Sequence, residues 1–124
     1  MGRRILIVDD EPDIREIARI SLEAIGGHEV IDVASGADAL DAAARQQPDA
    51  ILLDVMMPGL DGPSTFARLQ DSDATRDIPV IMLTAKVQET DRSRLLVMGA
   101  AAVLSKPFDP MHLADDVAAV LGWA

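Results

Sequence analysis

The chain has 124 residues, of which 49% are hydrophobic and 26% are charged, and this suits one globular domain with a single hydrophobic core. Its formal net charge of −10 argues against nucleic acid or an anionic membrane as a partner, because both require a basic protein surface. The sequence contains no cysteine, which excludes disulfides, thiolate metal sites and cysteine nucleophiles.

The first predicted element is a short buried strand near the N-terminus. Residues 5–8 are continuously apolar, and Asp9 interrupts the run. This run is too short for the apolar region of a signal peptide or for the roughly 20 residues of a membrane span, so we expect a cytoplasmic protein without a membrane segment. Apolar residues at helical spacing between 14 and 25 predict a helix, which Gly26 and Gly27 end.

The middle of the chain predicts two more strands, each followed by a helix. Residues 30–33 are more polar than the first strand, as is typical of a sheet edge. Ser35 predicts the N-cap of an Ala-rich helix that ends before Pro48. Residues 50–53 form the third predicted strand, and a turn-rich loop at 57–62 leads from it into the next helix.

The second half of the chain repeats this alternation. Residues 80–83 and 101–104 predict the fourth and fifth strands, and a helix around 89–97 separates them. Asp109 and Pro110 are the residue types of an N-cap and a first helical position, which predicts that the last helix opens there. Five strand–helix repeats favour an α/β fold, a doubly wound parallel sheet with right-handed crossovers and helices on both faces.

Reactive side chains follow four of the five predicted strands. Asp9 and Asp10 follow the first strand, and Asp54 follows the third. Thr84 stands at the end of the fourth strand, and Lys106 comes just after the fifth. Because the carboxyl ends of parallel strands lie at one edge of the sheet, we expect three carboxylates, one hydroxyl and one ammonium to meet at this rim.

This combination of groups favours phosphoryl chemistry that depends on magnesium. Clustered carboxylates repel one another and call for a cation, and oxygen ligands without histidine or cysteine favour Mg²⁺. The carboxylate of Asp54 can attack phosphorus and form an aspartyl phosphate, while Mg²⁺, Lys106 and Thr84 neutralise the equatorial oxygens of the transferred group. Each residue alone also has a structural explanation, as a cap, a turn residue or a solvated charge, so the prediction depends on their joint placement.

Four segments, in this order, resemble the signatures of bacterial response-regulator receiver domains, and the resemblance spans essentially the whole chain. It implies that residues 1–124 form one receiver domain with no output domain in this chain, and that the sheet is flavodoxin-like, with strand order 2-1-3-4-5 and five helices. The alternative of a receiver excised from a longer protein depends on the length of the natural reading frame. The segments are residues 5–11 (ILIVDDE), 54–62 (DVMMPGLDG), 80–85 (VIMLTA) and 106–108 (KPF).

The resemblance implies that Asp54 accepts a phosphoryl group from a phosphohistidine on a sensor histidine kinase or a histidine phosphotransfer protein. Asp10 and Asp54 would ligate Mg²⁺ together with the backbone carbonyl of Met56, and Asp9 would help largely through water. The chain would catalyse its own phosphorylation and dephosphorylation, and would not be an enzyme with a separate substrate.

The resemblance also implies how the phosphoryl group is sensed. Thr84 and Lys106 would contact it, and the Lys106–Pro107 peptide would be cis, a geometry common only before proline. Phosphorylation would change a protein-interaction face around the fourth helix, the fifth strand and the fifth helix, for a downstream protein that the sequence does not name. Many receivers carry Tyr or Phe at the position of Val103, and valine has no ring to swing. We therefore expect the Thr84 shift to be retained and the readout at this face to differ.

Four more residues receive weaker predictions. Met56 and Lys86 are expected to flank the approach of hydrolytic water. Met56 would obstruct the water as an apolar side chain, and Lys86 would either order it or, as the simpler expectation, be a solvated charge. His28 and His112 stand alone in the sequence, so we expect surface histidines rather than phosphocarriers or metal ligands.

Two other functional classes fit the sequence less well. An aspartate-dependent phosphohydrolase usually carries its nucleophile and its acid on one strand as Asp-x-Asp, whereas Asp9 and Asp10 are adjacent and Asp54 lies on another strand. Turnover of small phosphate esters would favour this class. A flavodoxin-like cofactor binder needs a phosphate loop rich in Ser, Thr or Gly after the first strand, and the acidic loop here would repel phosphate without a metal.

Overall fold

The computed structural model describes residues 2–85 and 89–123, and this part of the chain forms one five-stranded parallel sheet. The strands are β1 (Arg4–Val8), β2 (Glu29–Val33), β3 (Ala50–Asp54), β4 (Val80–Thr84) and β5 (Ala102–Ser105). Their order is β2-β1-β3-β4-β5, as the resemblance implies, and every neighbouring pair is parallel. Apart from Arg4, Asp54 and Thr84 at their ends, the inner strands β1, β3 and β4 are apolar, because helices cover both of their faces.

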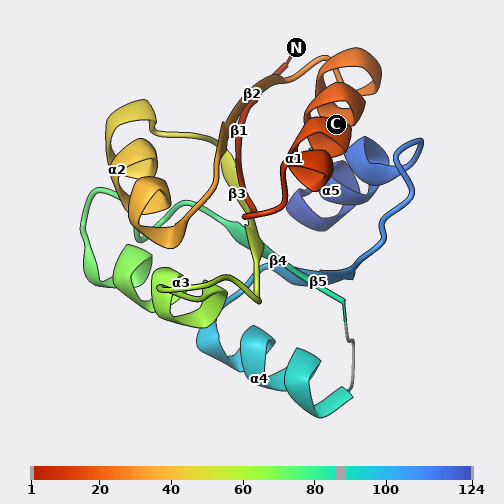
Figure 1. The fold of residues 1–124 in the computed structure, drawn as a ribbon. Helices are drawn as coiled ribbons and strands as arrows, with labels where there is room; N and C mark the ends of the chain where they lie inside the picture. The colour runs from red at the N-terminus through yellow and green to blue at the C-terminus, as the bar shows by residue number, and fades with distance from the viewer. Residues whose placement is uncertain (1, 86–88, 124) are drawn as a thin grey trace.

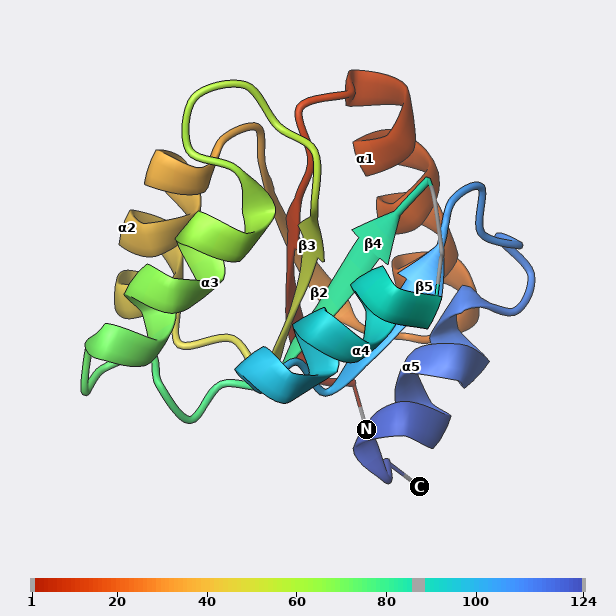
Figure 2. The ribbon, with the colours of Figure 1, turned by 90° about the horizontal axis from the view of Figure 1, so that it is seen from below.

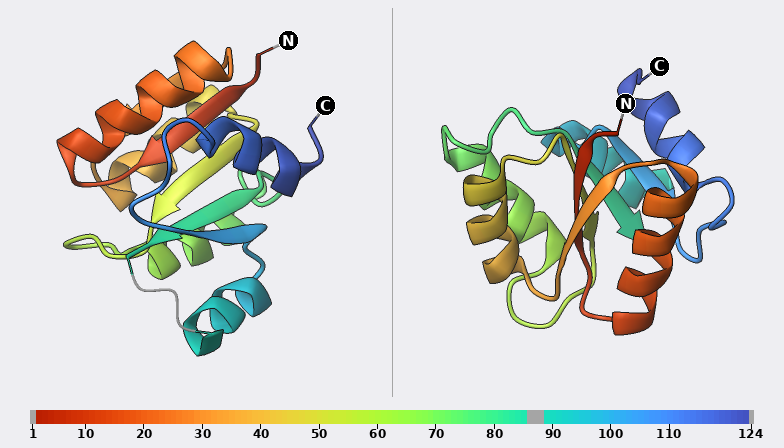
Figure 3. Two further views of the ribbon diagram at one scale, coloured as in Figure 1. Left: turned by 90° about the vertical axis from the view of Figure 1, so that its right-hand side faces the viewer. Right: turned by 90° about the horizontal axis from the view of Figure 1, so that it is seen from above.

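The helices form one layer on each side of the sheet (Figures 1 and 2). They are α1 (Pro12–Ile20), its π-helical continuation η1 (Ser21–Ile25), α2 (Gly36–Gln46), α3 (Gly62–Asp71), α4 (Glu89–Met98) and α5 (Leu113–Leu121). Residues of α2, α3 and α4 share one apolar core layer with the sheet, and residues of α1, η1 and α5 share the other. Figure 3 shows the helices on the two sides of the sheet in two further views. The predicted doubly wound α/β fold is confirmed. No helix in the described ranges is long and apolar enough to cross a membrane.

One predicted helix opening is confirmed and another is wrong. The hydroxyl of Ser35 accepts the N–H of Asp38 at 3.1 Å and caps α2 as expected. Asp109 and Pro110 do not open the last helix. The carboxylate of Asp109 instead accepts the N–H of Met111 at 2.9 Å, which closes a turn before α5 begins. A cap and an Asp turn use the same residue types, so the pattern alone did not separate them.

The first helix ends in a way that its spacing did not predict. Its last turn widens into η1, where the buried Ser21 donates its hydroxyl proton to the carbonyl of Pro110. Gly27, in the left-handed region at φ 69°, then turns the chain towards β2. The end of the first helix is therefore joined to the β5–α5 loop.

The register of the sheet brings the predicted reactive residues to one edge. Val8 of β1 lies opposite Leu53 of β3, so the residues that follow them, Asp9 and Asp54, stand level at neighbouring strand ends. The ends of β4 and β5 are level in the same way. The loops after β1, β3, β4 and β5 therefore start at the same edge of the sheet. In open parallel sheets, ligand-binding sites form at this edge, outside the carboxyl ends of the strands.

Candidate functional site

The acidic rim is centred on Asp54, the last residue of β3, which is only 3% exposed. Asp9 is fully buried beside it, and Asp10 is half-buried at the edge of the same loop. Carboxylate oxygens of Asp9, Asp10 and Asp54 all lie within 4.8 Å of one another. Three like charges this close repel strongly unless cations neutralise them.

Lys106 supplies one of these cations from the loop after β5. Its Nζ lies 2.8 Å from Asp9 Oδ2, 3.4 Å from Asp54 Oδ1 and 3.6 Å from Glu11 Oε1. Burial opposes the charge on Lys106, but the carboxylates of Asp9 and Asp54 outweigh it and raise the pKa of the ammonium above its ordinary value. One ammonium balances only part of three carboxylates, so the rim stays negative. Its oxygen donors suit a hard divalent cation such as Mg²⁺.

Thr84 and Lys106 are tied together through the backbone. Thr84 ends β4 and is 8% exposed, and its carbonyl accepts the N–H of Lys106 at 2.9 Å. The Lys106–Pro107 peptide is cis, as the resemblance implies. A hydroxyl-bearing residue and an ammonium-bearing residue thus sit on adjacent strand ends beside Asp54.

Met56 lies where the loop after β3 passes the carboxylate. Its N–H donates to Asp54 Oδ1 at 3.3 Å, while its side chain is 75% exposed. It borders a hollow of about 430 Å³ between the loops after β3 and β4 and the helices α3 and α4. Lys86, the other residue expected near the water path, lies outside the described residues. The hollow is lined by Val55, Met56, Pro63, Thr84, Ala85, Asp91, Arg94 and Leu95.

The buried position of Asp54 changes its acidity. Burial and then the neighbouring Asp9 carboxylate raise the pKa of Asp54 from an ordinary value of 3.8 to about 6, against the opposing effect of Lys106. The charged form of Asp54 is therefore held at a cost in stability while no further cation is bound. A bound divalent cation would remove this cost and keep the carboxylate ionised.

Asp54→Asn is therefore expected to stabilise the chain in the absence of Mg²⁺. At pH 7.5 we expect the free energy of unfolding to rise by about 2 kcal/mol, because the amide removes a buried charge. Since the pKa is about 6 in the folded chain and near 3.8 in the unfolded chain, the wild type gains stability relative to the variant as the pH falls through 6. Urea unfolding in chelator should show the difference closing near pH 4. A difference that stays constant from pH 7.5 to pH 4 would exclude the buried charge as its cause.

One residue beside the rim was not among the sequence-based predictions. Arg15, on α1, donates from its NH1 to the carbonyl of Asp9 at 2.8 Å, and its Nε lies 3.4 Å from Asp32 Oδ2. The sequence feature that could have indicated this contact is an arginine in the first turn of the helix that follows Asp9 and Asp10. Its partner Asp32, on the edge strand, could not be read from spacing.

Val103 is a core residue in this structure. It is 1% exposed and belongs to the apolar layer on the face covered by α2, α3 and α4. The valine therefore packs in the core at the position where many receivers carry an aromatic ring. Its effect on how phosphorylation changes the interaction face stays a prediction.

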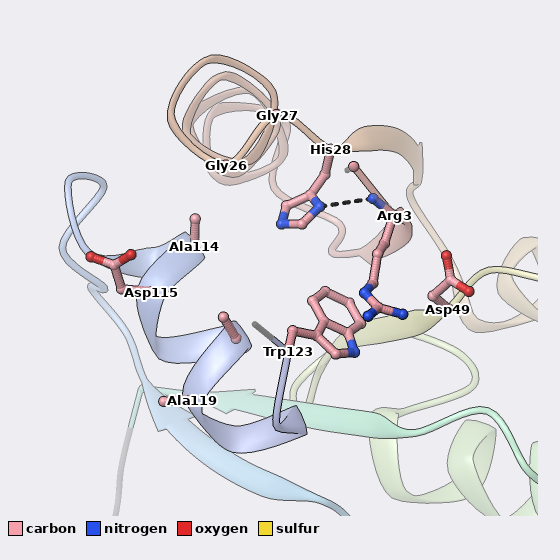
Figure 4. A pocket seen from close by; sticks show the side chains of 11 residues that line it. Arg3, Gly26, Gly27, His28, Asp49, Ala114, Asp115, Ala119 and Trp123 are labelled. Carbon is pink, nitrogen blue, oxygen red and sulfur yellow. Dashed lines mark hydrogen bonds between the residues drawn. The ribbon is translucent and has the colours of Figure 1, made fainter.

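A second and larger hollow of about 970 Å³ lies away from the rim, at the amino ends of β1 and β2 (Figure 4). There the guanidinium of Arg3 lies 4.8 Å from the ring centroid of Trp123, and the ring of His28 lies 5.5 Å from it. His28 Nδ1 also accepts the N–H of Arg3 at 3.1 Å, and burial together with Arg3 lowers the pKa of His28. His28 is half-buried in the lining of this hollow, with Arg3 and Trp123 as neighbours, and His112 is exposed as expected.

Comparison with known proteins agrees with this geometry. The sequence profile of the response regulator receiver domain matches residues 5–118. The chain is 41% identical over 121 residues to the phosphate regulon transcriptional regulatory protein PhoB of Pseudomonas aeruginosa, covering 98% of this chain and 52% of that protein. It is 44% identical over 115 residues to the response regulator PleD of Caulobacter vibrioides, covering 91% of this chain and 25% of that protein. The chain thus spans about half the length, or less, of these curated relatives.

Solved structures give the same result. The Vibrio cholerae chemotaxis protein CheY4 superposes with a TM-score of 0.89 at 29% identity, over 97% of this chain and 99% of that chain. The receiver domain of the sensor histidine kinase PA1611 from Pseudomonas aeruginosa, described with a magnesium ion in its active-site cleft, superposes with a TM-score of 0.86 at 34% identity, over 98% and 99%. Receiver domains are the phosphorylation-controlled signalling switches of two-component systems, and they bind Mg²⁺ at an acidic pocket. The chain belongs to the response-regulator receiver domain family.

Proposed function

We propose that Asp54 is the phosphoryl acceptor of this receiver and that its phosphorylation requires Mg²⁺. The observation that carries the proposal is the buried Asp54 carboxylate, with two further carboxylates within 4.8 Å and the ammonium of Lys106 at 3.4 Å. Two rim carboxylates beside one acceptor leave a net negative charge that a divalent cation would balance. The Mg²⁺ described in a similar receiver domain supports this assignment.

The residues at the rim divide into those that would hold the ion and those that would hold the phosphoryl group. Asp10, Asp54 and the backbone carbonyl of Met56 would bind Mg²⁺ directly, and Asp9 largely through water. When bound, Mg²⁺ would supply positive charge to the oxygens of the transferred phosphoryl group. Lys106 and Thr84 would donate hydrogen bonds to the same oxygens from the adjacent ends of β4 and β5.

The transfer step balances without any further reactant. An oxygen of the Asp54 carboxylate forms a bond to phosphorus while the bond from phosphorus to the donor's imidazole nitrogen breaks. That nitrogen keeps the bonding electron pair, so a donor ring already protonated on its other nitrogen leaves as neutral imidazole, and an unprotonated ring takes up one proton from solvent. The donor is a phosphohistidine on a sensor histidine kinase or a phosphotransfer protein, and water later hydrolyses the aspartyl phosphate.

Output is proposed to pass through the face formed by α4, β5 and α5 to a downstream protein. Large apolar side chains are exposed on two of these elements, with Val97 87% exposed and Leu96 40% exposed on α4, and Val120 37% exposed on α5. Exposed apolar side chains are typical of surfaces that bind proteins. Val103 lies beneath this face, so the usual swing of an aromatic ring is replaced by another form of readout.

Mass measurement of the intact chain tests the acceptor. Incubation with Mg²⁺ and a small phosphoramidate donor is expected to add one phosphoryl group, and excess chelator should suppress the adduct by at least about tenfold. Fragmentation should place the adduct on Asp54. An adduct located on another residue, or one that forms equally well in chelator, would contradict the proposal.

A further inference from the structure

The carbonyl of Asp9, in the middle of the acidic pair, is bound by a side chain that has no other place in the proposed chemistry. Arg15 NH1 donates to this carbonyl at 2.8 Å, and the Arg15 side chain is only 20% exposed. Burying a guanidinium costs free energy unless its N–H groups are paired, and Arg15 meets this requirement with the Asp9 carbonyl and the Asp32 carboxylate.

Arg15 is itself held in place by an ion pair to the edge strand. Its Nε lies 3.4 Å from Asp32 Oδ2, and the other oxygen of the same carboxylate lies 2.5 Å from Arg19 NH2. Asp32 is therefore bracketed by two guanidinium groups, of which only Arg15 also reaches the acidic loop. The three side chains connect α1, β2 and the loop after β1.

The carbonyl that Arg15 binds belongs to the peptide that joins Asp9 to Asp10. Because the peptide is planar, holding its carbonyl restricts ψ of Asp9 and φ of Asp10, the two dihedrals through which the backbone sets the direction of the Asp10 side chain. The Asp9 carboxylate has fixed partners of its own, since Oδ1 accepts the N–H of Glu11 at 2.9 Å and Oδ2 accepts from Lys106 at 2.8 Å. Within the described ranges, no hydrogen bond or ion pair holds the Asp10 carboxylate. Its direction therefore depends on the backbone.

We propose that Arg15 is a positioning residue for the divalent-cation site, because it fixes the peptide plane that orients Asp10. This rests on the proposed function, in which Asp10 is a direct Mg²⁺ ligand. Asp32 acts one step further away by holding the guanidinium of Arg15. Arg19 shares Asp32, and among the described residues no hydrogen bond or ion pair joins it to the loop after β1, which makes it the matched control.

Positioning and simple electrostatics predict opposite results. Arg15 carries a positive charge beside the rim, so by charge alone its removal would strengthen cation binding. If Arg15 orients Asp10, its removal weakens cation binding despite the lost repulsion. Residues that orient the ligands of a metal typically change its affinity by about 10- to 100-fold.

Calorimetric titration with MgCl₂ of the wild type, Arg15→Gln, Arg19→Gln and Arg15→Lys tests this role. We expect the Mg²⁺ dissociation constant of Arg15→Gln to rise about tenfold. That of Arg19→Gln should stay within about twofold of the wild type or fall, since only charge is lost. Arg15→Lys should be intermediate, because an ammonium can donate to the carbonyl but cannot bind Asp32 at the same time through a planar fork.

The outcomes separate the positioning role from the proposed function. An Arg15→Gln chain that binds Mg²⁺ as well as Arg19→Gln, or more tightly than the wild type, overturns the role of Arg15 alone. A wild-type chain without measurable affinity for Mg²⁺ contradicts the proposed function itself. Thermal unfolding in chelator checks that each variant is folded. Should Arg15→Gln not fold, Asp32→Asn keeps the arginine, removes its brace and should still raise the dissociation constant above that of Arg19→Gln.

Discussion

Replacing Asp54 by asparagine is expected to abolish the phosphoryl adduct that the wild type forms with Mg²⁺ and a phosphoramidate. The carboxamide has nearly the same shape but is not a nucleophile towards phosphorus, so the extent of phosphorylation should fall by at least about a hundredfold. Asp54 is 3% exposed and bound by the N–H of Met56, which an asparagine oxygen can also accept. The fold should therefore persist, and intact-mass measurement reads the result directly.

Asp61→Asn is the matched control for this variant. Asp61 stands in the loop that follows β3, and its carboxylate accepts the N–H of Ser64 at 2.8 Å as the N-cap of α3. Asparagine caps helices about as well as aspartate, so stability should change by only a few tenths of a kcal/mol and the adduct should form normally. An adduct that survives in Asp54→Asn, or disappears in Asp61→Asn, would show that the acceptor has been misassigned.

Lys106→Met is expected to cost the chain about 3 kcal/mol of unfolding free energy in the absence of Mg²⁺. The Asp9 carboxylate is fully buried and lies 2.8 Å from the Lys106 ammonium, so the variant leaves a buried charge without its cation. Millimolar Mg²⁺ should restore much of the loss, because an ion that binds only the folded chain stabilises it. Urea unfolding with chelator and with Mg²⁺ measures both effects.

Arg45→Met shows what an ordinary surface charge contributes. Arg45 NH2 lies 3.1 Å from Asp41, and both side chains are well exposed on α2. Such pairs contribute about 0.5 kcal/mol or less, and Mg²⁺ should not change the result. If Lys106→Met were no less stable than Arg45→Met in chelator, the pair between the Lys106 ammonium and Asp9 would not stabilise the folded chain.

The sheet and the rim could be predicted because each depends on short stretches of sequence. The runs at 5–8, 50–53 and 80–83 are apolar throughout, and Asp9, Asp54 and Thr84 follow them directly, so the strands could be placed. Strict alternation with helices then requires parallel strands, and parallel strands end at one edge. The meeting of Asp9, Asp54 and their neighbours follows from that rule without any knowledge of distances.

The contacts that refine the site could not be predicted, because their partners are distant in sequence. Nothing near Arg15 indicates that Asp32, on another strand, holds its guanidinium. The bond from Ser21 to the carbonyl of Pro110 joins two segments that no periodicity relates. The same residue types also occur in a helix cap and in an isolated turn, and this is why the prediction that the last helix begins at Asp109 was wrong.

The acidity of Asp54 shows the same limit in electrostatic form. The sequence predicts which carboxylates gather, but the direction of a pKa shift depends on burial and on the distances to Asp9 and Lys106. Here burial and Asp9 outweigh the ammonium, so the pKa is raised although a lysine lies 3.4 Å away.

The backbone bond from Lys106 to the carbonyl of Thr84 makes the ends of β4 and β5 one mechanical unit. A ligand that displaces the backbone of Thr84 must break this bond or carry the amide of Lys106 with it. The ammonium of Lys106 also binds Asp9 across the rim, in the loop that follows β1. A displacement of the Thr84 backbone at the end of β4 would therefore be transmitted through Lys106 to Asp9, beside β1. This path consists of one main-chain hydrogen bond and one side-chain ion pair, and it does not require the apolar core to move.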